Sequence, residues 1–492
     1  MRDWLTLRAD ATPTRTAMID ARSGEAVSYA TLDDRVATLA GRLSALGLDA
    51  GDHLAVLART RPAFVELVYA AARVGAVLVP INARLTADEV ATIADRADVD
   101  LLVCESSTEA ATETFDGPVA SLDTPNANAR DLAHVDPAPF EPASWTRDQT
   151  QVAIATSGTT GGPKLVRLTT GNLAASAAAS SWRLGVLPSD RWYCTLPMYH
   201  MGGLAPVYRS VLYGTAVVVG TPGSFDPERA LTEMDVHDAS GVSLVPTMLR
   251  NLLDADDGVL SDLRFALVGG AATPNALVDR AHEAGVAVYP SYGMTETASQ
   301  IATARPTDTE RALGSVGTPL VFSEVSILTD DSDEALVGEP GEIVVSGPTV
   351  TPGYYDDPEA TEAAFGPHGF HTGDAGYRDE EGRLWVLNRL DDRIVTGGEN
   401  VDPGEVTGVL RDHPDVTDAF VLGLPDDRYG ERVAAVVTGT LDVDDVDSVE
   451  SFARERLAGF KIPRAWRVVD DLPRTASGTV DRGAIRDLFD DA

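Results

Sequence analysis

The chain has 492 residues, 44% of them hydrophobic, so it is long enough to form more than one folded core. Its 76 acidic and 39 basic residues leave a net charge of −37, which argues against nucleic acid or an anionic membrane as a partner. The chain has no apolar run of about 18 residues, no signal-peptide core at its start and only two cysteines. We therefore expect a cytoplasmic protein without membrane insertion or a disulfide framework.

The acidic residues are dispersed along the chain rather than gathered in one tail. A strongly acidic surface is typical of a halophilic protein, because concentrated salt screens its self-repulsion. At about 1 M salt the Debye length is only ~3 Å, so an anionic substrate is no longer repelled at long range. The composition is compatible with a homo-oligomer but does not require one.

Helical patterns and short apolar runs alternate in the first part of the chain. The patterns predict helices over Thr31–Leu46 and Pro62–Val74, and strands over Leu54–Leu57, Ala76–Val79 and Leu101–Cys104. Between residues 106 and 150 the composition shifts to Ala, Thr, Asp and Pro, which predicts irregular surface structure.

Residues 156–164 read Thr-Ser-Gly-Thr-Thr-Gly-Gly-Pro-Lys. Glycines give the backbone freedom and small hydroxyl side chains supply donors, a combination that can surround a polyanion. The preceding apolar run, Gln151–Ala155, predicts a buried strand, so the segment lies at a strand end where α/β proteins bind phosphates. A GxxxxGK[ST] loop is excluded, because Pro163 precedes the lysine and Leu165 follows it. The sequence predicts a nucleotide-phosphate loop of another kind, the alternative being a flexible surface loop.

Strand-like and helical runs alternate again after this loop, as in the βαβ units of a mostly parallel sheet. The predicted strands are Ala216–Val219, Val242–Val245, Phe265–Val268 and Val286–Tyr289. From Glu324 the strands shorten and the turns tighten, which favours an antiparallel or barrel-like portion. Its predicted parts are the strands Val325–Leu328 and Glu342–Val345 and a hairpin over Tyr377–Leu387.

The last hundred residues predict a separate small α+β unit. Its predicted helices are Pro403–Arg411 and Ser448–Leu457, and its strands are Ala419–Leu422 and Val433–Val437. The charged stretch Arg389–Asp392 predicts a boundary between domains of residues 1–391 and 392–492. The expected fold class is α/β: a large domain of stacked, mostly parallel sheets with a small barrel-like portion, then a small mobile α+β domain.

Six segments in one order resemble the core motifs of the acyl-adenylate-forming superfamily, which includes acyl- and aryl-CoA ligases, luciferases and peptide-synthetase adenylation domains. These segments are Thr156–Lys164, Leu196–Gly203, Gly269–Ala272, Tyr292–Glu296, His371–Asp374, and Arg389 followed by Gly397–Asn400. The resemblance covers nearly the whole chain, and the conjunction of motifs is far more specific than any one of them.

The resemblance implies an enzyme that uses ATP, Mg²⁺, CoA and a small-molecule carboxylic acid. It also implies a phosphate-binding role for Thr156, Ser157, Gly158, Thr159, Thr160, Gly161 and Lys164. Phosphoryl transfer depends on positioning and charge neutralisation, which these groups can supply. Glu296 is the implied Mg²⁺ ligand and a catalytic residue, since Mg²⁺ takes few protein oxygens beside phosphates.

The remaining implied roles concern the nucleotide, the ribose, CoA and domain rotation. The nucleotide would lie against Gly269, Gly270, Ala271, Tyr292, Gly293, Met294 and Thr295. Asp374 would accept the ribose hydroxyls and Arg389 would donate to the same sugar. Asp392 matches the hinge position, and Gly397 and Gly398 would let the backbone approach the pantetheine arm of CoA.

The C-terminal signature of the superfamily, PRTxSGKIxR, is changed here. Its lysine bridges the acid carboxylate and the α-phosphate, whereas this chain has Thr479 at that position. Three interpretations remain open. In the first, Lys461, Arg474 or Arg482 replaces the lysine, with Lys461 a candidate catalytic residue. In the second, adenylation is slow but adequate. In the third, the protein has lost adenylation and is a thioester-forming or nucleotide-binding relic.

Two residues bear on the identity of the acid. His200 either contacts the acid, together with Gly270, or is a packed histidine beside Tyr199. Arg209 lies in an otherwise apolar helical segment, so it is either a surface residue with a buried stem or the partner of a second substrate carboxylate. The second possibility resembles the o-succinylbenzoate–CoA ligases of menaquinone synthesis, whose substrate carries an extra carboxylate. Other aryl- or fatty-acid–CoA ligases and carrier-protein-loading enzymes remain alternatives.

Overall fold

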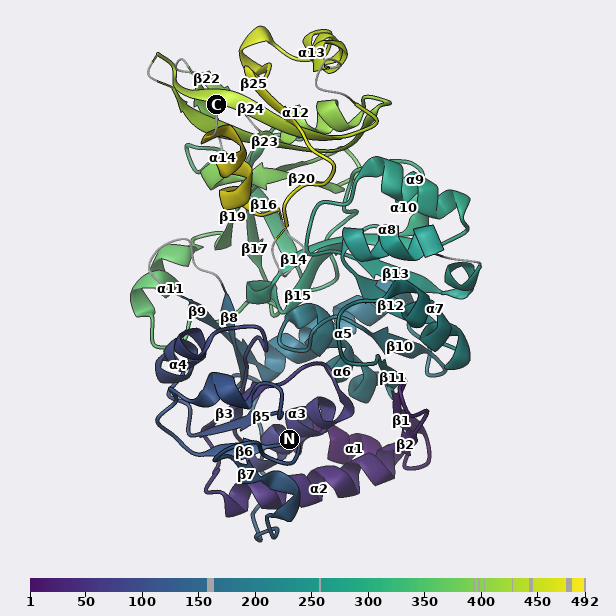
Figure 1. Ribbon diagram of the computed structural model, residues 1–492, viewed down its shortest axis with the longest axis vertical. Coiled ribbons are helices and arrows are strands. Elements are labelled where there is room, and N and C mark those ends of the chain that lie inside the picture. Colours follow the sequence, from purple (N-terminus) through teal and green to yellow (C-terminus); the bar gives the residue numbers. More distant parts are fainter. Residues whose placement is uncertain are drawn as a thin grey trace.

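The structure is a computed structural model, and its described residues form four sheets. The described residues are 1–156, 163–255, 258–392, 394–396, 399–401, 403–426, 428–441, 446–474 and 480–490. Figure 1 shows the N-terminal helices at the bottom, the long α/β body in the middle and the last sheet at the top. The predicted α/β fold class is confirmed.

The first α/β sheet has seven strands in the order β7-β6-β5-β3-β4-β8-β9. Their bounds are β3 His53–Leu57, β4 Val77–Pro80, β5 Leu101–Cys104, β6 Val119–Ser121, β7 Arg130–Asp131, β8 Thr150–Thr156 and β9 Lys164–Thr169. All neighbours are parallel except the β8–β9 hairpin, in which Thr156 pairs with Lys164. Thr156 and Lys164, the two ends of the predicted phosphate loop, are therefore paired strand residues.

The second α/β sheet has eight strands in the order β15-β14-β13-β12-β10-β11-β1-β2. Their bounds are β1 Thr16–Asp20, β2 Ala26–Ser28, β10 Arg191–Cys194, β11 Ala216–Val219, β12 Gly241–Leu244, β13 Phe265–Val268, β14 Val288–Met294 and β15 Ser299–Thr303. Its central pairs are parallel, as predicted. Every residue of β11, β12 and β13 is buried, as is typical of a parallel sheet covered on both faces.

Helices cover both sheets, and α5 contacts strands of each. The helices of this part are α1 Trp4–Ala11, α2 Tyr29–Ala45, α3 Pro62–Val74, α4 Ala87–Arg96, α5 Thr170–Leu184, α6 Met201–Tyr213, α7 Pro227–Val236, α8 Pro246–Ala255, α9 Asn275–Glu283 and α10 Pro306–Thr309. Local signals explain their ends: Pro62 opens α3, and Gly75, in the left-handed region at φ 97°, ends it.

The two remaining sheets are mainly antiparallel. The third contains β16 Glu324–Leu328, β17 Gly341–Ser346, β18 Phe365–Gly366, β19 Gly369–Arg378 and β20 Leu384–Arg389, with α11 Pro358–Ala364 beside it. The fourth contains β21 Ile394–Thr396, β22 Glu399–Val401, β23 Val416–Asp426, β24 Gly430–Gly439 and β25 Ala465–Val468, with α12 Pro403–Arg411, α13 Val446–Arg454 and α14 Arg482–Asp490. Two apolar clusters around the fourth sheet contain only residues after position 393.

The prediction of irregular surface structure between residues 106 and 150 is wrong in part. β6 and β7 extend the first sheet, and Leu132 and Trp145 are buried. These two strands are only three and two residues long, so they leave no periodic pattern in the sequence. Among the helices of the described ranges, none is long and apolar enough to cross a membrane.

Candidate active site

A cavity of about 880 Å³ opens at the carboxyl ends of the parallel strands β10 to β14, beside the start of α6. Ligands of α/β sheets bind at this edge. It brings together seven of the predicted site residues, namely His200, Arg209, Gly269, Gly270, Gly293, Met294 and Thr295. Arg474, from the C-terminal unit, also lines it.

Arg209 is the unusual group of this cavity, because it is a buried cation. Its side chain points from α6 and is only 3% exposed. Nη2 donates to Ser299 Oγ at 3.1 Å and to Gln300 Oε1 at 3.0 Å, and the guanidinium lies 5.2 Å from the Trp192 ring. No carboxylate of the described residues forms an ion pair with it, and burial lowers its pKa to about 9. Burial excludes the interpretation of Arg209 as a surface residue.

The two acceptors of Arg209 come from a strained turn. Ala298 and Ser299 have φ angles of 53° and 121°, which non-glycine residues rarely adopt. The turn directs Ser299 toward Arg209, while the Gln300 amide nitrogen donates to Thr303 Oγ1 at 2.7 Å, which orients its carbonyl oxygen. Strain of this kind persists where surrounding structure enforces it, and it clusters at functional sites. No local pattern in the sequence indicated these two residues.

His200 is at the N-terminus of α6 and lines the same cavity. Its ring contacts Tyr199 edge-on at 4.9 Å, and the surrounding atoms lower the imidazole pKa by desolvation. The ring is therefore neutral at pH 7. Its exposed surface faces the cavity, so it is accessible to an acid.

Asp374 and Arg389 lie opposite each other on β19 and β20. The Tyr292 hydroxyl donates to Asp374 Oδ2 at 2.6 Å, and Arg389 Nη1 lies 3.2 Å from Asp374 Oδ1. Burial raises the pKa of Asp374, an effect that both neighbours oppose. The three predicted residues thus form one polar group, in which Asp374 is buried and both of its carboxylate oxygens have a partner.

Glu296 lies in a short 3₁₀ turn, Thr295–Thr297, after β14. The Tyr354 hydroxyl donates to Glu296 Oε1 at 3.3 Å, and burial raises the pKa of the carboxyl. In the described part of the chain no basic side chain forms an ion pair with Glu296, and no cluster of three or more His, Cys, Asp or Glu side chains could hold a metal. A single half-buried carboxylate fits Mg²⁺, which keeps waters and takes substrate phosphates as its other ligands.

The C-terminal residues make ion pairs of their own. Asp392 pairs with Arg482 of α14, and Lys461 Nζ donates to Glu405 Oε1 at 2.7 Å. Lys461 is not among the residues that line the cavity, so the structure does not bring it to the other predicted site residues. The predictions for Ser157, Gly158, Thr159, Thr160, Gly161, Gly397, Gly398 and Thr479 lie outside the described residues.

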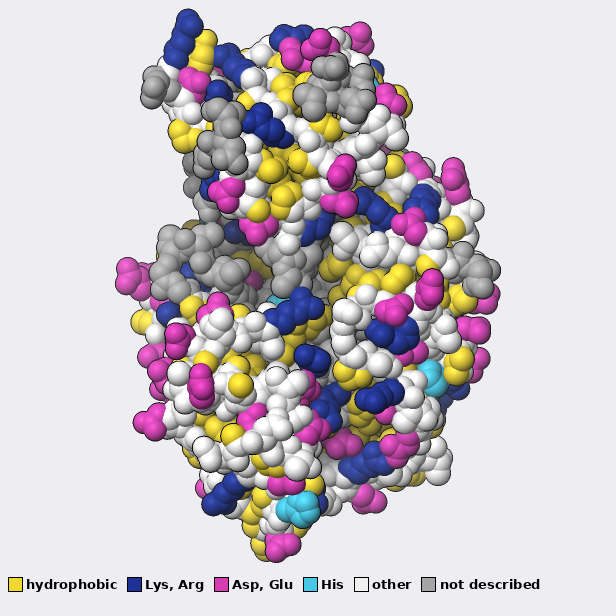
Figure 2. Space-filling view, viewed as in Figure 1, with side chains coloured by type: hydrophobic (Ala, Val, Ile, Leu, Met, Phe, Trp, Pro, Cys, Tyr) yellow, Lys and Arg dark blue, Asp and Glu magenta, His cyan; other side chains and the backbone are white. Residues whose placement is uncertain are grey.

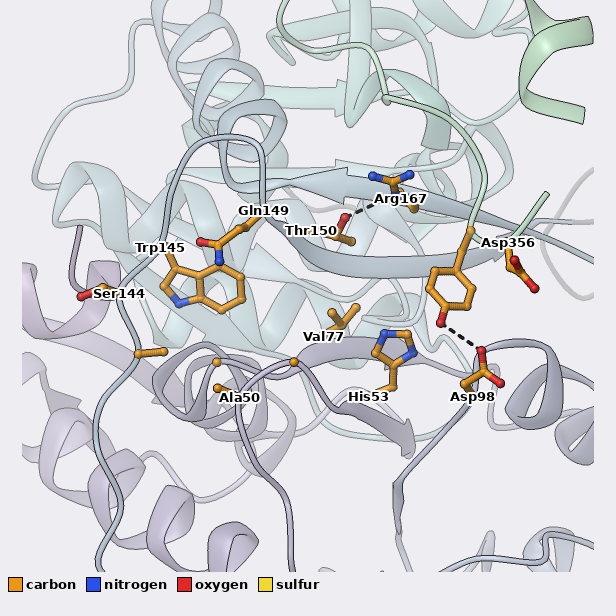
Figure 3. A pocket seen from close by; sticks show the side chains of 14 residues that line it. Ala50, His53, Val77, Asp98, Ser144, Trp145, Gln149, Thr150, Arg167 and Asp356 are labelled. Atoms are coloured by element: carbon orange, nitrogen blue, oxygen red, sulfur yellow. Dashed lines mark hydrogen bonds between the residues drawn. The ribbon is translucent and has the colours of Figure 1, made fainter. Parts of the chain in front are cut away.

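A second cavity, of about 760 Å³, opens near the amino ends of β3, β4 and β8. In Figure 3 the ring of His53 points into it, with Arg167 above and Asp98 at one side. None of the predicted site residues lines it, and it is separate from the cavity that holds Arg209.

Comparison with known proteins agrees with this architecture. Residues 5–355 match the family model of the AMP-binding enzyme, and residues 405–479 match the model of the AMP-binding enzyme C-terminal domain. A 2–succinylbenzoate–CoA ligase from Bacillus velezensis is 37% identical, over 99% of this chain and 98% of its own length.

Solved structures of the o-succinylbenzoate CoA synthetase from Bacillus subtilis are also similar. Its complex with the acyl-adenylate intermediate has a TM-score of 0.89 at 34% identity, over 99% of this chain and 98% of the other. A double mutant of the same relative with a product analogue, over the same shares of both chains, has a TM-score of 0.76. The present structure is thus more similar in arrangement to the acyl-adenylate complex. On the family match and the full-length relatives, the chain belongs to the AMP-binding enzyme family.

Proposed function

We propose that this protein is an AMP-forming 2-succinylbenzoate–CoA ligase. The acid carboxylate attacks the α-phosphorus of ATP and releases pyrophosphate, and the CoA thiol then attacks the acyl carbon, releasing AMP and a proton. The curated relatives carry this name over their full length. The observation in this chain that carries the proposal is Arg209, a buried cation in the cavity without a carboxylate partner among the described residues.

A second carboxylate on the substrate explains Arg209. A buried charge is costly unless it is paired, so a protein retains one where a ligand completes the pair. The carboxylate of 2-succinylbenzoate that is not activated would accept from the Arg209 guanidinium. A hydrogen bond to a charged group contributes about 1.5–3 kcal/mol. A fatty acid or simple benzoate has no such group, which disfavours those alternatives.

The nucleotide would occupy the neighbouring polar groups. Asp374, held by Tyr292 and Arg389, would accept the ribose hydroxyls. Lys164 and the segment from Thr156 to Gly161 would hold the β- and γ-phosphates. Glu296 would hold Mg²⁺, which when bound neutralises phosphate charge. His200, neutral and open to the cavity, would contact the aromatic acid.

We propose that residues 392–492 move as one domain about Asp392. In support, the fourth sheet and its apolar clusters contain only residues beyond this position. The ion pair between Asp392 and Arg482 joins the hinge to the last helix. Gly397 and Gly398 would approach the pantetheine arm after such a rotation.

A pyrophosphate-release screen at molar KCl tests the function. We expect release with 2-succinylbenzoate and little with benzoates, cinnamates or fatty acids. Assays with and without CoA separate the ligase from a carrier-protein-loading enzyme, because only the ligase would form a thioester with CoA. Binding of ATP without pyrophosphate release from any acid would instead identify a nucleotide-binding relic.

Halophilic adaptation is a second part of the proposal. Figure 2 shows Asp and Glu side chains scattered over the visible face rather than in one patch. Salt screens their repulsion, so we expect the melting temperature to rise between 0.1 M and about 2 M KCl. Differential scanning calorimetry measures this, with sucrose at equal osmolality as the control. A fall in melting temperature with KCl would reject it.

A further inference from the structure

Tyr354 is a buried residue that no sequence motif singled out, only 7% exposed. Its backbone forms a bridge with Val166 of β9, and its amide donates to Thr361 Oγ1 at 3.0 Å. The next amide, that of Tyr355, donates to Leu165 O at 2.8 Å. The backbone of Tyr354 is therefore attached to the strand that begins with Lys164.

The Tyr354 side chain contacts two predicted site residues from distant segments. Its hydroxyl donates to Glu296 Oε1 at 3.3 Å, and Lys164 Nζ lies 5.0 Å from the centroid of its ring. The Glu296 backbone is held nearby, because the Thr351 amide donates to its carbonyl oxygen at 2.7 Å. One aromatic side chain thus contacts both the ammonium group and the carboxylate.

We propose that Tyr354 is a positioning residue that keeps Lys164 and Glu296 apart and available, Lys164 for the ATP phosphates and Glu296 for Mg²⁺. The inference rests on the proposed function. Without Tyr354, the opposite charges of Lys164 and Glu296 would attract each other into a direct ion pair. The ring offers the ammonium a cation–π contact and the hydroxyl offers the carboxylate a donor. Each charged group therefore has a partner that does not neutralise it.

Two variants separate the two contacts. Tyr354→Phe removes the hydroxyl and keeps the ring, so we expect the Mg²⁺ concentration for half-maximal pyrophosphate release to rise about ten-fold. The KM for ATP at saturating Mg²⁺ should stay within about two-fold. Tyr354→Leu also removes the ring, so the KM for ATP should rise a further ~3–5-fold.

Binding measurements provide a readout apart from turnover. Mn²⁺ binding in the presence of a non-hydrolysable ATP analogue, followed by electron paramagnetic resonance, should weaken about ten-fold in Tyr354→Phe. In a Glu296→Gln background, Tyr354→Phe should cause no further loss, because the two side chains act on the same ion. Melting curves without ligand check that each variant is folded.

Tyr355→Phe is the matched control. Tyr355 faces the second cavity, where its hydroxyl donates to Asp98 Oδ2 at 2.9 Å, the bond dashed in Figure 3. Its Mg²⁺ and ATP dependence should equal that of the wild type. Overlapping Mn²⁺ titrations of wild type and Tyr354→Phe would overturn the inference. Because these titrations need no acid, that result is distinct from failure of the proposed ligase activity.

Discussion

Arg209→Ala should lower kcat/KM for 2-succinylbenzoate by roughly 10²–10³-fold, a loss of about 3–4 kcal/mol of transition-state stabilisation. The variant removes a charged hydrogen bond and also leaves a substrate carboxylate buried without a donor. Ser299 and Gln300 remain in place, but one hydroxyl and one amide cannot neutralise the charge. Arg209 is thus expected to distinguish a dicarboxylate from a simple aromatic acid.

The measurement compares 2-succinylbenzoate with benzoate, which lacks the second carboxylate. Any weak activity with benzoate should change little in Arg209→Ala. Arg191→Ala is the matched control, because Arg191 pairs with Asp238 on the surface at 3.0 Å and does not line the cavity. An unchanged KM for the dicarboxylate would show that the pocket assignment is wrong.

The stability of an Arg209 variant also tests whether Arg209 is retained for a substrate carboxylate. A guanidinium that is buried without an anion destabilises the free protein, so Arg209→Met should unfold at the same or a higher denaturant midpoint. A residue kept only for packing would instead lower the midpoint when replaced. Greater stability together with lost activity is expected of a group retained for its substrate.

The parallel sheets could be predicted because their strands are continuous apolar runs separated by helical patterns. Phe265–Val268 and Pro62–Val74, for example, have the predicted bounds. The strands β6 and β7 could not be predicted, since strands this short carry no periodicity. A neighbouring strand, and not their own composition, determines their conformation.

The candidate site likewise contains residues that could be predicted from the sequence and residues that could not. Asp374, Arg389 and Glu296 stand in motifs whose order along the chain identifies them. The burial of Arg209 depends on Trp192 and Gln300, which are distant in sequence, so the apolar helix alone left two interpretations open. Tyr354 gave no signal at all, because its contacts arise only when β9 and the Glu296 turn meet.

A separate question is which cation of the C-terminal unit replaces the superfamily's lysine. Adenylation brings a carboxylate to the α-phosphate, and the superfamily places a lysine where this chain has Thr479. Of the three candidate cations, Lys461 pairs with Glu405 and Arg482 with Asp392. Arg474 lines the cavity and shares the buried carboxylate of Asp418 with Arg411, at 2.8 and 2.7 Å. Arg474 is therefore the one of these three cations that lines the cavity.

Thr479→Lys restores the family's lysine and should accelerate pyrophosphate release with 2-succinylbenzoate, by up to about 10²-fold if no other cation serves this step. Thr479→Gln, similar in length but neutral, is the control and should leave the rate unchanged. Arg474→Ala should slow the wild type and have less effect in the Thr479→Lys background, because the new lysine supplies the same charge. If Thr479→Lys fails to raise the rate while Arg474→Ala lowers it, Arg474 already supplies the positive charge for adenylation, and the missing lysine does not limit that step.

If neither variant changes the rate, a later step such as thioester formation or product release governs turnover. Single-turnover measurements of acyl-adenylate would then report the chemical step directly.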